Sequence, residues 1–539
     1  MDGESVFGAT VADYSGTIPR LLERAVRRDP ARTWIRTDDV ELSFAQAGAR
    51  VADAVNELSL AGIGTGDLVM VTARTTPDYL LAWLALAHLG AVTVPVNPAS
   101  SAAELTGLIR QVEPVAIVTD AELGAAISAA TQAAQEAGGR PVRVTLRISD
   151  LFSDQPGRQL ADLPPSSAGP GDLAVLIPTS GTTGRSKLVA QTHRAYAMAG
   201  EGFPFWMGLD ASDRLMTSLP LFHINAPIYS VLGSLACGAG LVLLPRFSAS
   251  GFIDAARRHG ATEFNAIGAM LEILMRQPER ADDADNPLRL CYTGPAPERG
   301  RQEEIERRFG LRIVVGYAMS ESPYGLIWAH GARPFGTLGS VRQHPYLGTI
   351  NEAKVVDQDA LTGLGPGETG ELWLRNPVLT PGYRGMPEET AAVLTADGWL
   401  RTGDLVTMNG DGTYTFVGRR KEVLRRRGEN LSPLEVEEVL DSHPAVLESA
   451  VVGIESDLSE EDIKAFVVAA AGQRVDFDEL RAYAAERLSA FKVPRFWQLI
   501  DELPRTPTAR LAKHRLPEGH QPGEHDAQAH RGAGDSGQP

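Results

Sequence analysis

The sequence has little cysteine, few aromatic residues and a deficit of positive charge. Its 539 residues include two cysteines, Cys237 and Cys291, which are too few for a disulfide framework and lack the spacing of metal ligands. Aromatic residues make up 6% of the chain, and 51 Lys and Arg stand against 68 Asp and Glu, a formal net charge of -17. Because this charge repels phosphate backbones, we expect no nucleic-acid partner.

Long hydrophobic runs are also missing. Residues 1–5 carry neither the basic nor the apolar part of a signal peptide. The stretch from Ile228 to Leu244 is nearly apolar, but it is short and three glycines interrupt it. We therefore expect a buried passage from helix to strand there, not a membrane span. The sequence predicts a cytoplasmic protein without a membrane partner.

What the chain does have is enough length for two or more domains. Over most of it, apolar runs, Gly/Pro/Ser loops and helical patterns alternate. The expected elements are strands at 68–72, 91–95 and 172–177, a helix at 78–89, and a further helix capped by Thr192. This alternation predicts an α/β fold: a large layered α/β N-terminal domain, residues 1–417, with mostly parallel sheets.

The pattern changes at Gly418. Ser432 and Pro433 open a capping box, which predicts the start of a helix. The expected elements after it are strands near 450–454 and 463–469, a helix over 476–488 and a strand over 496–500. Residues 418–516 therefore predict a small, mobile α+β C-terminal lid domain. Residues 517–539 lack periodicity and predict a disordered tail.

The segment after the strand at 172–177 has the composition of a phosphate-binding loop. Its residues are Thr179, Ser180, Gly181, Thr182, Thr183, Gly184 and Lys187. Glycines allow a tight turn that points backbone amides at an anion, hydroxyls donate hydrogen bonds, and the lysine adds a positive charge. The Gly-Lys-Ser/Thr ending of a Walker loop is missing. The alternative, a polar turn between strand and helix, is disfavoured by this density of donors.

Four further segments follow along the chain. They are Gly294 to Pro297, Gly316 to Glu321, Trp399 to Asp404, and Gly418-Arg419. Each is weak evidence alone. Together with the loop, in this order and spacing, they resemble the adenylate-forming (AMP-binding) superfamily of acyl-CoA synthetases, firefly-type luciferases and peptide-synthetase adenylation domains. The resemblance spans about residues 17–516.

The resemblance implies how these segments bind a nucleotide. Tyr317 lies against adenine, in a pocket that Gly294 and Pro295 also line. Asp404 binds both ribose hydroxyls, and Arg419 reaches the ribose too. The departure from the family's Gly-Tyr-Gly pattern is alanine, which follows Tyr317 in this chain.

The phosphates and the metal come next in the resemblance. Ser320 touches the α-phosphate, and Glu321 holds magnesium together with Thr179. The implied cofactors are ATP or acyl-AMP, coenzyme A and Mg²⁺. The implied partner is a small-molecule carboxylic acid or its acyl-adenylate.

Residues 220–226 indicate the branch of the superfamily. The amino-acid-activating branch places a carboxylate there, and this chain has none, which favours the acyl-CoA synthetase branch. The segments around residues 222–226, 247–250 and 427–430 look most like the carnitine- and crotonobetaine-type CoA ligases. His223 would lie near the substrate carboxylate, at the mouth of the pantetheine tunnel, where it could act as a gate. A hydrogen-bonded loop histidine is the alternative.

Residues 419–428 form a basic run in an acidic protein. They offer cations to the phosphates of coenzyme A, or else they are a solvated charge run on a hairpin. By the resemblance, Lys421 is the hinge between the domains. The coenzyme A loop reaches the active site after the lid rotates, and its residues are Arg425, Arg427, Gly428 and Glu429.

One departure from the family affects adenylation. Ala509-Arg510 stands where the family carries a Gly-Lys whose lysine bridges the substrate carboxylate and the α-phosphate. Arginine keeps the charge, but its guanidinium is a wide planar fork, whereas lysine is a compact point charge. Ser186 and Leu188 also replace the usual flanks of the loop lysine.

These departures predict an acyl-CoA ligase that forms the thioester but adenylates poorly or not at all. Preformed acyl-adenylate would then come from a separate adenylating enzyme. Three alternatives stay open: a complete ligase in which Arg510 stands in for lysine, a non-catalytic acyl-adenylate-binding protein, and a luciferase-like monooxygenase.

Overall fold

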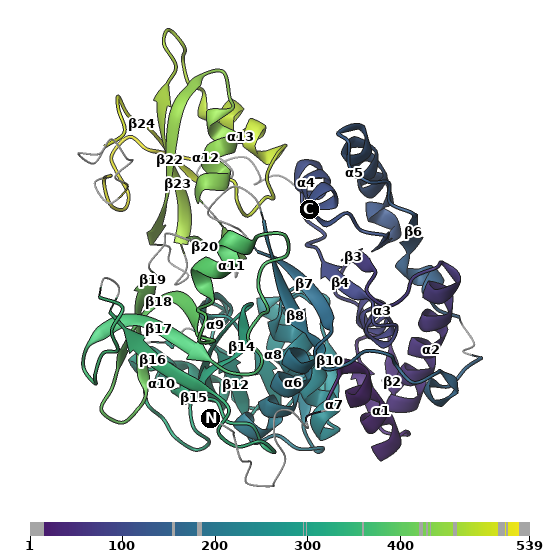
Figure 1. Cartoon of the computed structure of the whole chain (residues 1–539). Helices are drawn as coiled ribbons and strands as arrows, with labels where there is room; N and C mark the ends of the chain where they lie inside the picture. The colour runs from purple at the N-terminus through teal and green to yellow at the C-terminus, as the bar shows by residue number, and fades with distance from the viewer. Residues whose placement is uncertain are drawn as a thin grey trace.

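The computed structural model describes residues 14, 16–153, 157–179, 186–294, 296–297, 299–357, 360–419, 424–426, 429–431, 433–455, 461–504, 513 and 516–527. We call the described residues up to 419 the body and those from 424 onward the lid. Figure 1 shows the lid above the body, with helices α4 (Ala102–Val112) and α5 (Gly124–Glu136) of the body beside it.

The first sheet of the body is mostly parallel because helices connect its strands. Its order is β6-β5-β3-β4-β7-β8, and β8 runs antiparallel to β7. The strands are β3 (Leu68–Thr72), β4 (Val92–Pro95), β5 (Ala116–Thr119), β6 (Val144–Arg147), β7 (Leu173–Thr179) and β8 (Lys187–Thr192). With helix α3 (Pro77–His88), they confirm the expected elements to within two residues.

The second sheet runs β15-β14-β13-β12-β11-β9-β10-β1-β2, with a parallel centre and antiparallel ends. Its strands are β1 (Thr33–Arg36), β2 (Glu41–Ser43), β9 (Arg214–Thr217), β10 (Gly240–Leu243), β11 (Glu263–Asn265), β12 (Leu290–Thr293), β13 (Arg312–Met319), β14 (Ser322–Ile327) and β15 (Ser340–Val341). The carboxyl ends of its parallel strands meet at one edge, where open α/β sheets bind ligands.

A third sheet, order β16-β17-β18-β19, is antiparallel throughout. Its strands are β16 (Glu352–Val356), β17 (Thr369–Arg375), β18 (Leu400–Met408) and β19 (Tyr414–Arg419). The other body helices and short turns are α1 (Ile18–Arg28), α2 (Phe44–Leu60), η1 (Ala121–Leu123), η2 (Ile148–Leu151), η3 (Leu160–Asp162), α6 (His193–Met207), η4 (Ala226–Leu232), α7 (Gly233–Cys237), η5 (Ala249–Gly251), α8 (Phe252–His259), α9 (Gly268–Met275), α10 (Arg299–Phe309) and α11 (Pro387–Val393).

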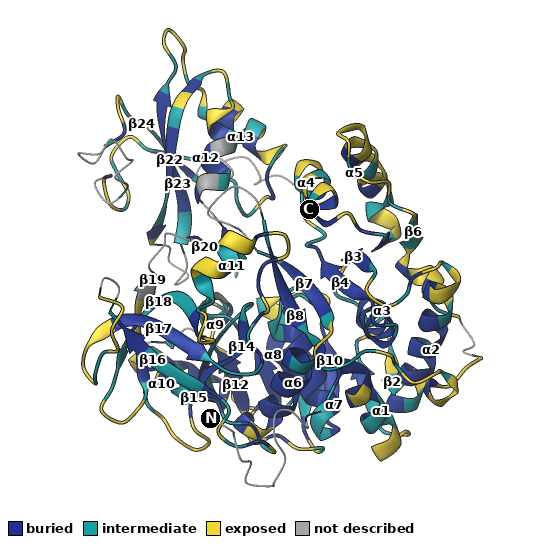
Figure 2. Cartoon of the chain, in the orientation of Figure 1, coloured by how far each residue is buried: buried dark blue, intermediate teal, exposed yellow. Residues whose placement is uncertain are grey.

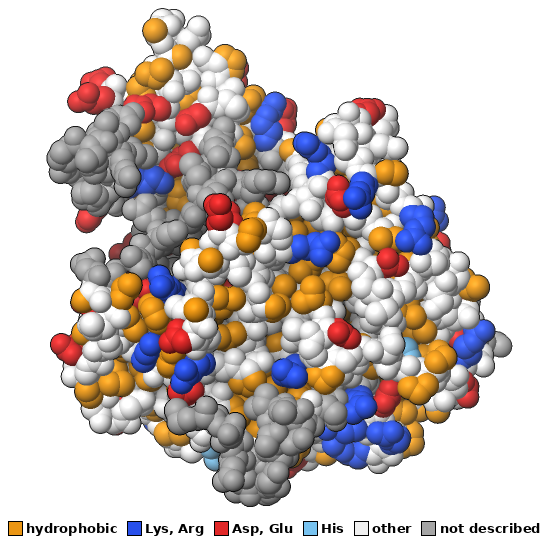
Figure 3. All heavy atoms as spheres, viewed as in Figure 1, with side chains coloured by type: hydrophobic (Ala, Val, Ile, Leu, Met, Phe, Trp, Pro, Cys, Tyr) orange, Lys and Arg blue, Asp and Glu red, His pale blue; other side chains and the backbone are white. Residues whose placement is uncertain are grey.

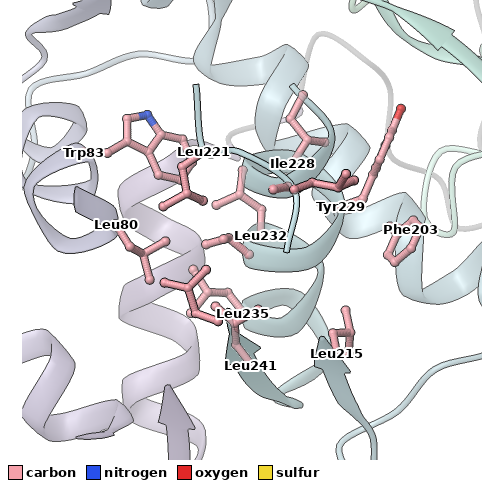
Figure 4. Close-up of a cluster of buried hydrophobic side chains, with 14 of the residues drawn as sticks. Leu80, Trp83, Phe203, Leu215, Leu221, Ile228, Tyr229, Leu232, Leu235 and Leu241 are labelled. Atoms are coloured by element: carbon pink, nitrogen blue, oxygen red, sulfur yellow. The ribbon is translucent and has the colours of Figure 1, made fainter. Parts of the chain in front are cut away.

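The largest hydrophobic core joins the two big sheets. Figure 4 shows Leu80 and Trp83 of α3 facing Leu221 and the η4–α7 helix, with Leu241 of β10 below them. All of these side chains are buried, and Figure 2 shows β7 and β10 mostly in the colour of buried residues. The apolar stretch from Ile228 to Leu244 is therefore the buried helix-to-strand passage that the sequence predicts.

The lid contains a hairpin and a small sheet covered by helices. The hairpin is β20 (Leu424–Arg426) with β21 (Glu429–Leu431), and the sheet order is β22-β23-β24-β25. The elements are α12 (Pro433–Asp441), β22 (Val446–Glu455), β23 (Glu461–Ala469), α13 (Phe477–Ala485) and β24 (Phe496–Leu499). The helix start at Pro433 and the later elements match the α+β expectation. The domain boundary at 418 stays a prediction, since β19 runs to Arg419.

The end of the lid corrects one expectation. Residues 516–527 pack on the lid, and β25 (His525–Asp526) pairs antiparallel with β24. The buried ammonium of Lys464 contacts Glu524, with 2.7 Å between Nζ and Oε2. The expected tail is therefore wrong for residues 517–527, because a low-periodicity segment can still be fixed by an ion pair and an edge strand. Residues 528–539 lie outside the described part.

No helix in the described ranges combines the length and apolar character that crossing a bilayer needs. Figure 3 shows basic and acidic side chains interspersed on one face of the molecule.

Candidate active site

The predicted phosphate loop connects two antiparallel strands. β7 ends at Thr179 and β8 begins at Lys187, so the loop closes a hairpin and does not lead into a helix. The helix comes after β8, where the Thr192 hydroxyl caps α6 by accepting from Ala195 N. The residues Ser180, Gly181, Thr182, Thr183 and Gly184 lie outside the described part of the chain.

Two predicted nucleotide-binding side chains meet near the carboxyl end of β13. The Tyr317 hydroxyl donates to Oδ2 of Asp404, with 2.6 Å between the oxygens. Asp404 lies on β18, in the third sheet, and is buried. The contact fixes both groups without help from the lid. Asp404 is the residue expected to bind the ribose hydroxyls.

Gly294 explains how the backbone approaches closely at the same edge. It follows β12, and a Cβ there would lie 2.5 Å from the carbonyl oxygen of Gly316 on β13. A residue with a side chain at this position would push these two segments apart. Pro295, its predicted companion, lies outside the described residues, and so do the side chains of Arg419 and Arg425.

Tyr383 contacts both Glu321 and the loop lysine, Lys187. The Tyr383 hydroxyl donates to Glu321 Oε1 at 2.9 Å, and Nζ of Lys187 lies 4.4 Å from the centre of the Tyr383 ring. Burial, and then the negative charge of Glu321, raise the pKa of Tyr383 well above its usual range, so it stays a donor. The sequence did not predict Tyr383 as a site residue. It stands in a Pro-Gly-Tyr turn, and such a turn alone does not predict contact with a carboxylate 62 residues away.

The same neighbourhood can be tested for a metal. Within the described residues, no three of His, Cys, Asp and Glu gather as a metal-binding group. Mg²⁺ is usually held by one or two carboxylates plus substrate phosphates, so one carboxylate suffices when a nucleotide is bound. Glu321 supplies one such carboxylate, and Thr179, at the end of β7, donates its hydroxyl to the Lys187 carbonyl at 3.4 Å. Ser320 is held nearby, since its carbonyl accepts from Gln191 Nε2 at 2.6 Å.

His223 and Glu429 meet across the boundary between body and lid. Nε2 of His223 lies 2.8 Å from Oε1 of Glu429. His223 belongs to the loop after β9, at the edge where the parallel strands end, and Glu429 begins β21 of the lid hairpin. The two residues are 206 positions apart in sequence, and each was predicted separately as a site residue.

A cavity of about 870 Å³ extends from this contact between body and lid. Its wall includes Thr179, Phe222, His223 and Ser320 of the body, the side of α4, and lid residues Glu429, Glu435 and Lys492. The volume is in the range of cofactor-sized sites. The cavity therefore connects the candidate phosphate and carboxylate groups to the surface at α4.

Comparison with known proteins decides the family. Residues 22–384 match the AMP-binding enzyme family, and residues 435–510 match the AMP-binding enzyme C-terminal domain. The crotonobetaine/carnitine–CoA ligase of Salmonella paratyphi A is 30% identical over 494 residues, which cover 88% of this chain and 93% of that one. The chain is an AMP-binding enzyme.

Solved structures give the same assignment for this AMP-binding enzyme. The amide bond synthetase of Marinactinospora thermotolerans superposes with a TM-score of 0.80 at 25% identity, covering 93% of this chain and 99% of that one. The o-succinylbenzoate CoA synthetase of Bacillus subtilis, at 24% identity, shares the fold with a TM-score of 0.81, covering 94% and 100%. The family match and the ligase activity of the relatives confirm the resemblance that the motifs indicated.

The basic run of the AMP-binding enzyme has one member that is not available to a ligand. Arg426 is buried, and its guanidinium donates to the carbonyls of Phe491 and Val493 at 3.1 and 2.7 Å and lies near Asp462. Arg426 is therefore neither solvated nor free to bind coenzyme A, so neither interpretation of the basic run fits this arginine. The hinge residue Lys421 and the loop residues Arg427 and Gly428 lie outside the described part.

Arg510 also lies outside the described part, but its segment is held at both sides. Leu503 before it and Leu516 after it are buried in one cluster with Phe466. Lys513, three positions after Arg510, contacts Glu437 Oε1 at 2.6 Å and donates to the Val451 carbonyl at 3.2 Å.

Proposed function

We propose that this ligase joins a carboxylic acid to coenzyme A through its acyl-adenylate, and that it performs the thioester step far better than the adenylation step. The observation that carries the thioester step is the 2.8 Å contact between His223 and Glu429 at the cavity. It supports a lid orientation in which the predicted coenzyme A loop faces the body's site.

The body's residues would bind the adenylate. Asp404, already oriented by Tyr317, would accept from the ribose hydroxyls. Glu321 and Thr179 would hold Mg²⁺, which supplies positive charge against the phosphate when bound. The loop lysine, Lys187, would contact the phosphate from its place over the Tyr383 ring.

The thioester step needs a nucleophile delivered to the adenylate's carbonyl. The thiol of coenzyme A gives its proton to water, its sulfur bonds to the acyl carbon, and the bond from that carbon to the phosphate oxygen breaks, so that AMP leaves with the electron pair. Glu429 would hold the His223 imidazole at the inner end of the cavity, where the ring borders the path of the thiol. Cations of the basic run would meet the phosphates at the outer end.

Impaired adenylation is supported by where the nearby lysine lies. If Lys513 replaced the missing family lysine, its ammonium would have to reach the α-phosphate. It is instead held in the lid by Glu437 and the Val451 carbonyl. Arg510 remains the candidate, with a geometry unlike lysine's. An adenylate supplied by another adenylating enzyme would bypass this step.

The test compares two reactions on the same acid, starting from a panel led by carnitine and crotonobetaine because of the Salmonella relative. One tube holds acid, ATP and coenzyme A, and the other holds synthetic acyl-adenylate and coenzyme A. We expect acyl-CoA mainly in the second tube. Equal turnover in both would make the chain a complete ligase with Arg510 in place of lysine.

Two further outcomes overturn the proposal altogether. Adenylate binding without release of AMP would indicate a binding protein. Amide formation when an amine replaces coenzyme A, with no thioester, would place the chain with the amide bond synthetase.

A further inference from the structure

The N-terminus of α4 has a capping box whose two side chains both contact the lid. Within the box, Ser101 Oγ accepts from Glu104 N at 3.3 Å and Glu104 Oε2 accepts from Ser101 N at 2.8 Å. Such reciprocal bonds satisfy two backbone donors that would otherwise lack partners. They also hold both side chains in one rotamer each, facing the lid.

The lid binds this box through residues 487–492. Lys492 Nζ contacts Glu104 Oε1 at 2.7 Å, the Ser489 hydroxyl donates to Glu104 Oε2, and the Ser101 hydroxyl donates to the Arg487 carbonyl at 2.9 Å. Lys492 also contacts Glu435 Oε1 of the lid, again at 2.7 Å. Three polar contacts thus join body and lid on one helical turn.

The charges of this contact depend on each other. Burial would raise the pKa of Glu104, but Lys492 and its other donors hold it below its usual value. Burial would lower the pKa of Lys492, but Glu435 and Glu104 hold it above its usual value. Both side chains are 13% exposed, so separating them leaves the Glu104 carboxylate without a cation, whereas Lys492 keeps Glu435.

A single arginine connects this contact to the active site. Arg426 pairs with Glu429 in the lid hairpin. Its guanidinium donates to the carbonyls of Phe491 and Val493, which flank Lys492. The position of Lys492 on α4 therefore fixes the hairpin, and the hairpin places Glu429 against His223.

We propose that Ser101 and Glu104 are positioning residues that dock the lid in its thioester-forming orientation, with Lys492 as the docking cation. The inference rests on the proposed function for its catalytic consequence, but the docking itself does not. Body residues that touch neither ligand nor reacting atoms thereby set how often Glu429 meets His223.

Helix α2 supplies the means to test this without disturbing a helix cap. Its capping box has Ser43 with Gln46 in the place of Glu104, so glutamine is able to close the box. Glu104→Gln should therefore keep the cap of α4 and remove only the charge that holds Lys492. Glu352→Gln is the matched control, since Glu352 pairs with Arg375 on the body, 2.8 Å apart, away from the lid.

The first readout is lid position. Dyes on Leu60→Cys of the body and Leu447→Cys of the lid, both well exposed, report it by energy transfer. The native thiols should not react, because Cys291 is fully buried and burial raises the pKa of Cys237 to about 11. We expect energy transfer to change in Glu104→Gln and Lys492→Met and to stay unchanged in Glu352→Gln.

The second readout is turnover of preformed acyl-adenylate with coenzyme A. Glu104→Gln should lower kcat roughly 10-fold, less than the loss of a fully buried pair because Lys492 keeps Glu435, with adenylate affinity unchanged. Unchanged energy transfer, or an equal loss of adenylate affinity, would overturn the proposal. If the wild-type protein forms no acyl-CoA but Glu104→Gln still changes the energy transfer, the proposed function is wrong. The docking contact would then remain supported.

Discussion

The body and the lid hold their candidate site residues in different ways. In the body, Asp404 and Glu321 are each held by a tyrosine of the same domain, at 2.6 and 2.9 Å. In the lid, Glu429 reaches the site through Arg426 and the contact of Lys492 with α4. The two tyrosine contacts lie within the body, whereas the contact of Glu429 with His223 needs the lid in this orientation. Under the proposed function, the body would retain the adenylate and the lid would select the reaction.

The largest effect should come from removing the end of the lid. Deleting residues 517–539 removes Glu524 and leaves Lys464 buried without its carboxylate. Breaking one side of a buried pair costs about 3 kcal/mol or more, so the lid should melt at lower temperature while the body does not. Calorimetry should resolve this, and deletion of 528–539 alone is the control. Equal shifts of body and lid would mean that the two fold as one unit.

The next effect concerns the lid's chemistry. Ala509→Gly with Arg510→Lys restores the compact charge that the family uses, and we expect ATP-dependent release of pyrophosphate to rise ~100-fold or more. Thioester formation from preformed adenylate should stay within about twofold, since the Glu429 face is unaltered. The pyrophosphate assay decides. No gain would mean that Arg510 already serves, or that Ser186 and Leu188 cause the loss.

A body substitution should affect both half-reactions alike. Asp404→Ala removes the carboxylate expected at the ribose, and hydrogen bonds to a charged group support a loss of AMP affinity of ~30-fold. Calorimetric titration with AMP measures it. Tyr317→Phe should weaken binding less, because it keeps the carboxylate and removes the group that orients it. A loss confined to thioester formation would contradict the division between body and lid.

Sequence predicted the fold where local pattern and burial agree. The strand at 68–72 is apolar at its first four positions and buried at all five, so one pattern sufficed. The site was predicted as far as motifs reach: Tyr317 and Asp404 were named for separate contacts with a nucleotide, and their hydrogen bond to each other was not foreseen. Tyr383 was missed because its partner, Glu321, lies on another element, and pairing between distant elements leaves no local signal.

At the end of the lid, the sequence predicted less structure than the protein has. Residues 517–527 have no periodicity, yet Lys464 and Arg495 bind Glu524 and Asp526 there. A buried lysine on a central strand, β23, was the available signal. Lysine is almost never fully buried unless paired, so Lys464 required an acidic partner that the sequence alone did not identify.

The smallest effect tests a buried charge of the body that has no partner. Glu263 on β11 is fully buried, and neither carboxylate oxygen has a hydrogen-bond partner. Burial, and then the charge of Asp213, raise its pKa well above the usual value of 4.5. A raised pKa means that the folded protein binds the proton more tightly than the unfolded chain. The loss of folding stability caused by Glu263 is therefore absent below about pH 4.5 and grows as the pH rises toward the folded-state pKa.

Glu263→Met replaces this carboxyl with an apolar side chain of similar length. We expect a gain of about 1 kcal/mol in the free energy of unfolding at pH 8 and almost none at pH 4, since the cost it removes is that of ionising in an apolar site. Urea titrations at the two pH values measure the difference, and Glu303→Met, on the exposed side of α10, is the control. An equal gain at both pH values would show that packing, not the charge, is responsible. Deleting the partner of the lid's Lys464 should therefore lower stability, whereas replacing the unpaired Glu263 of the body should raise it.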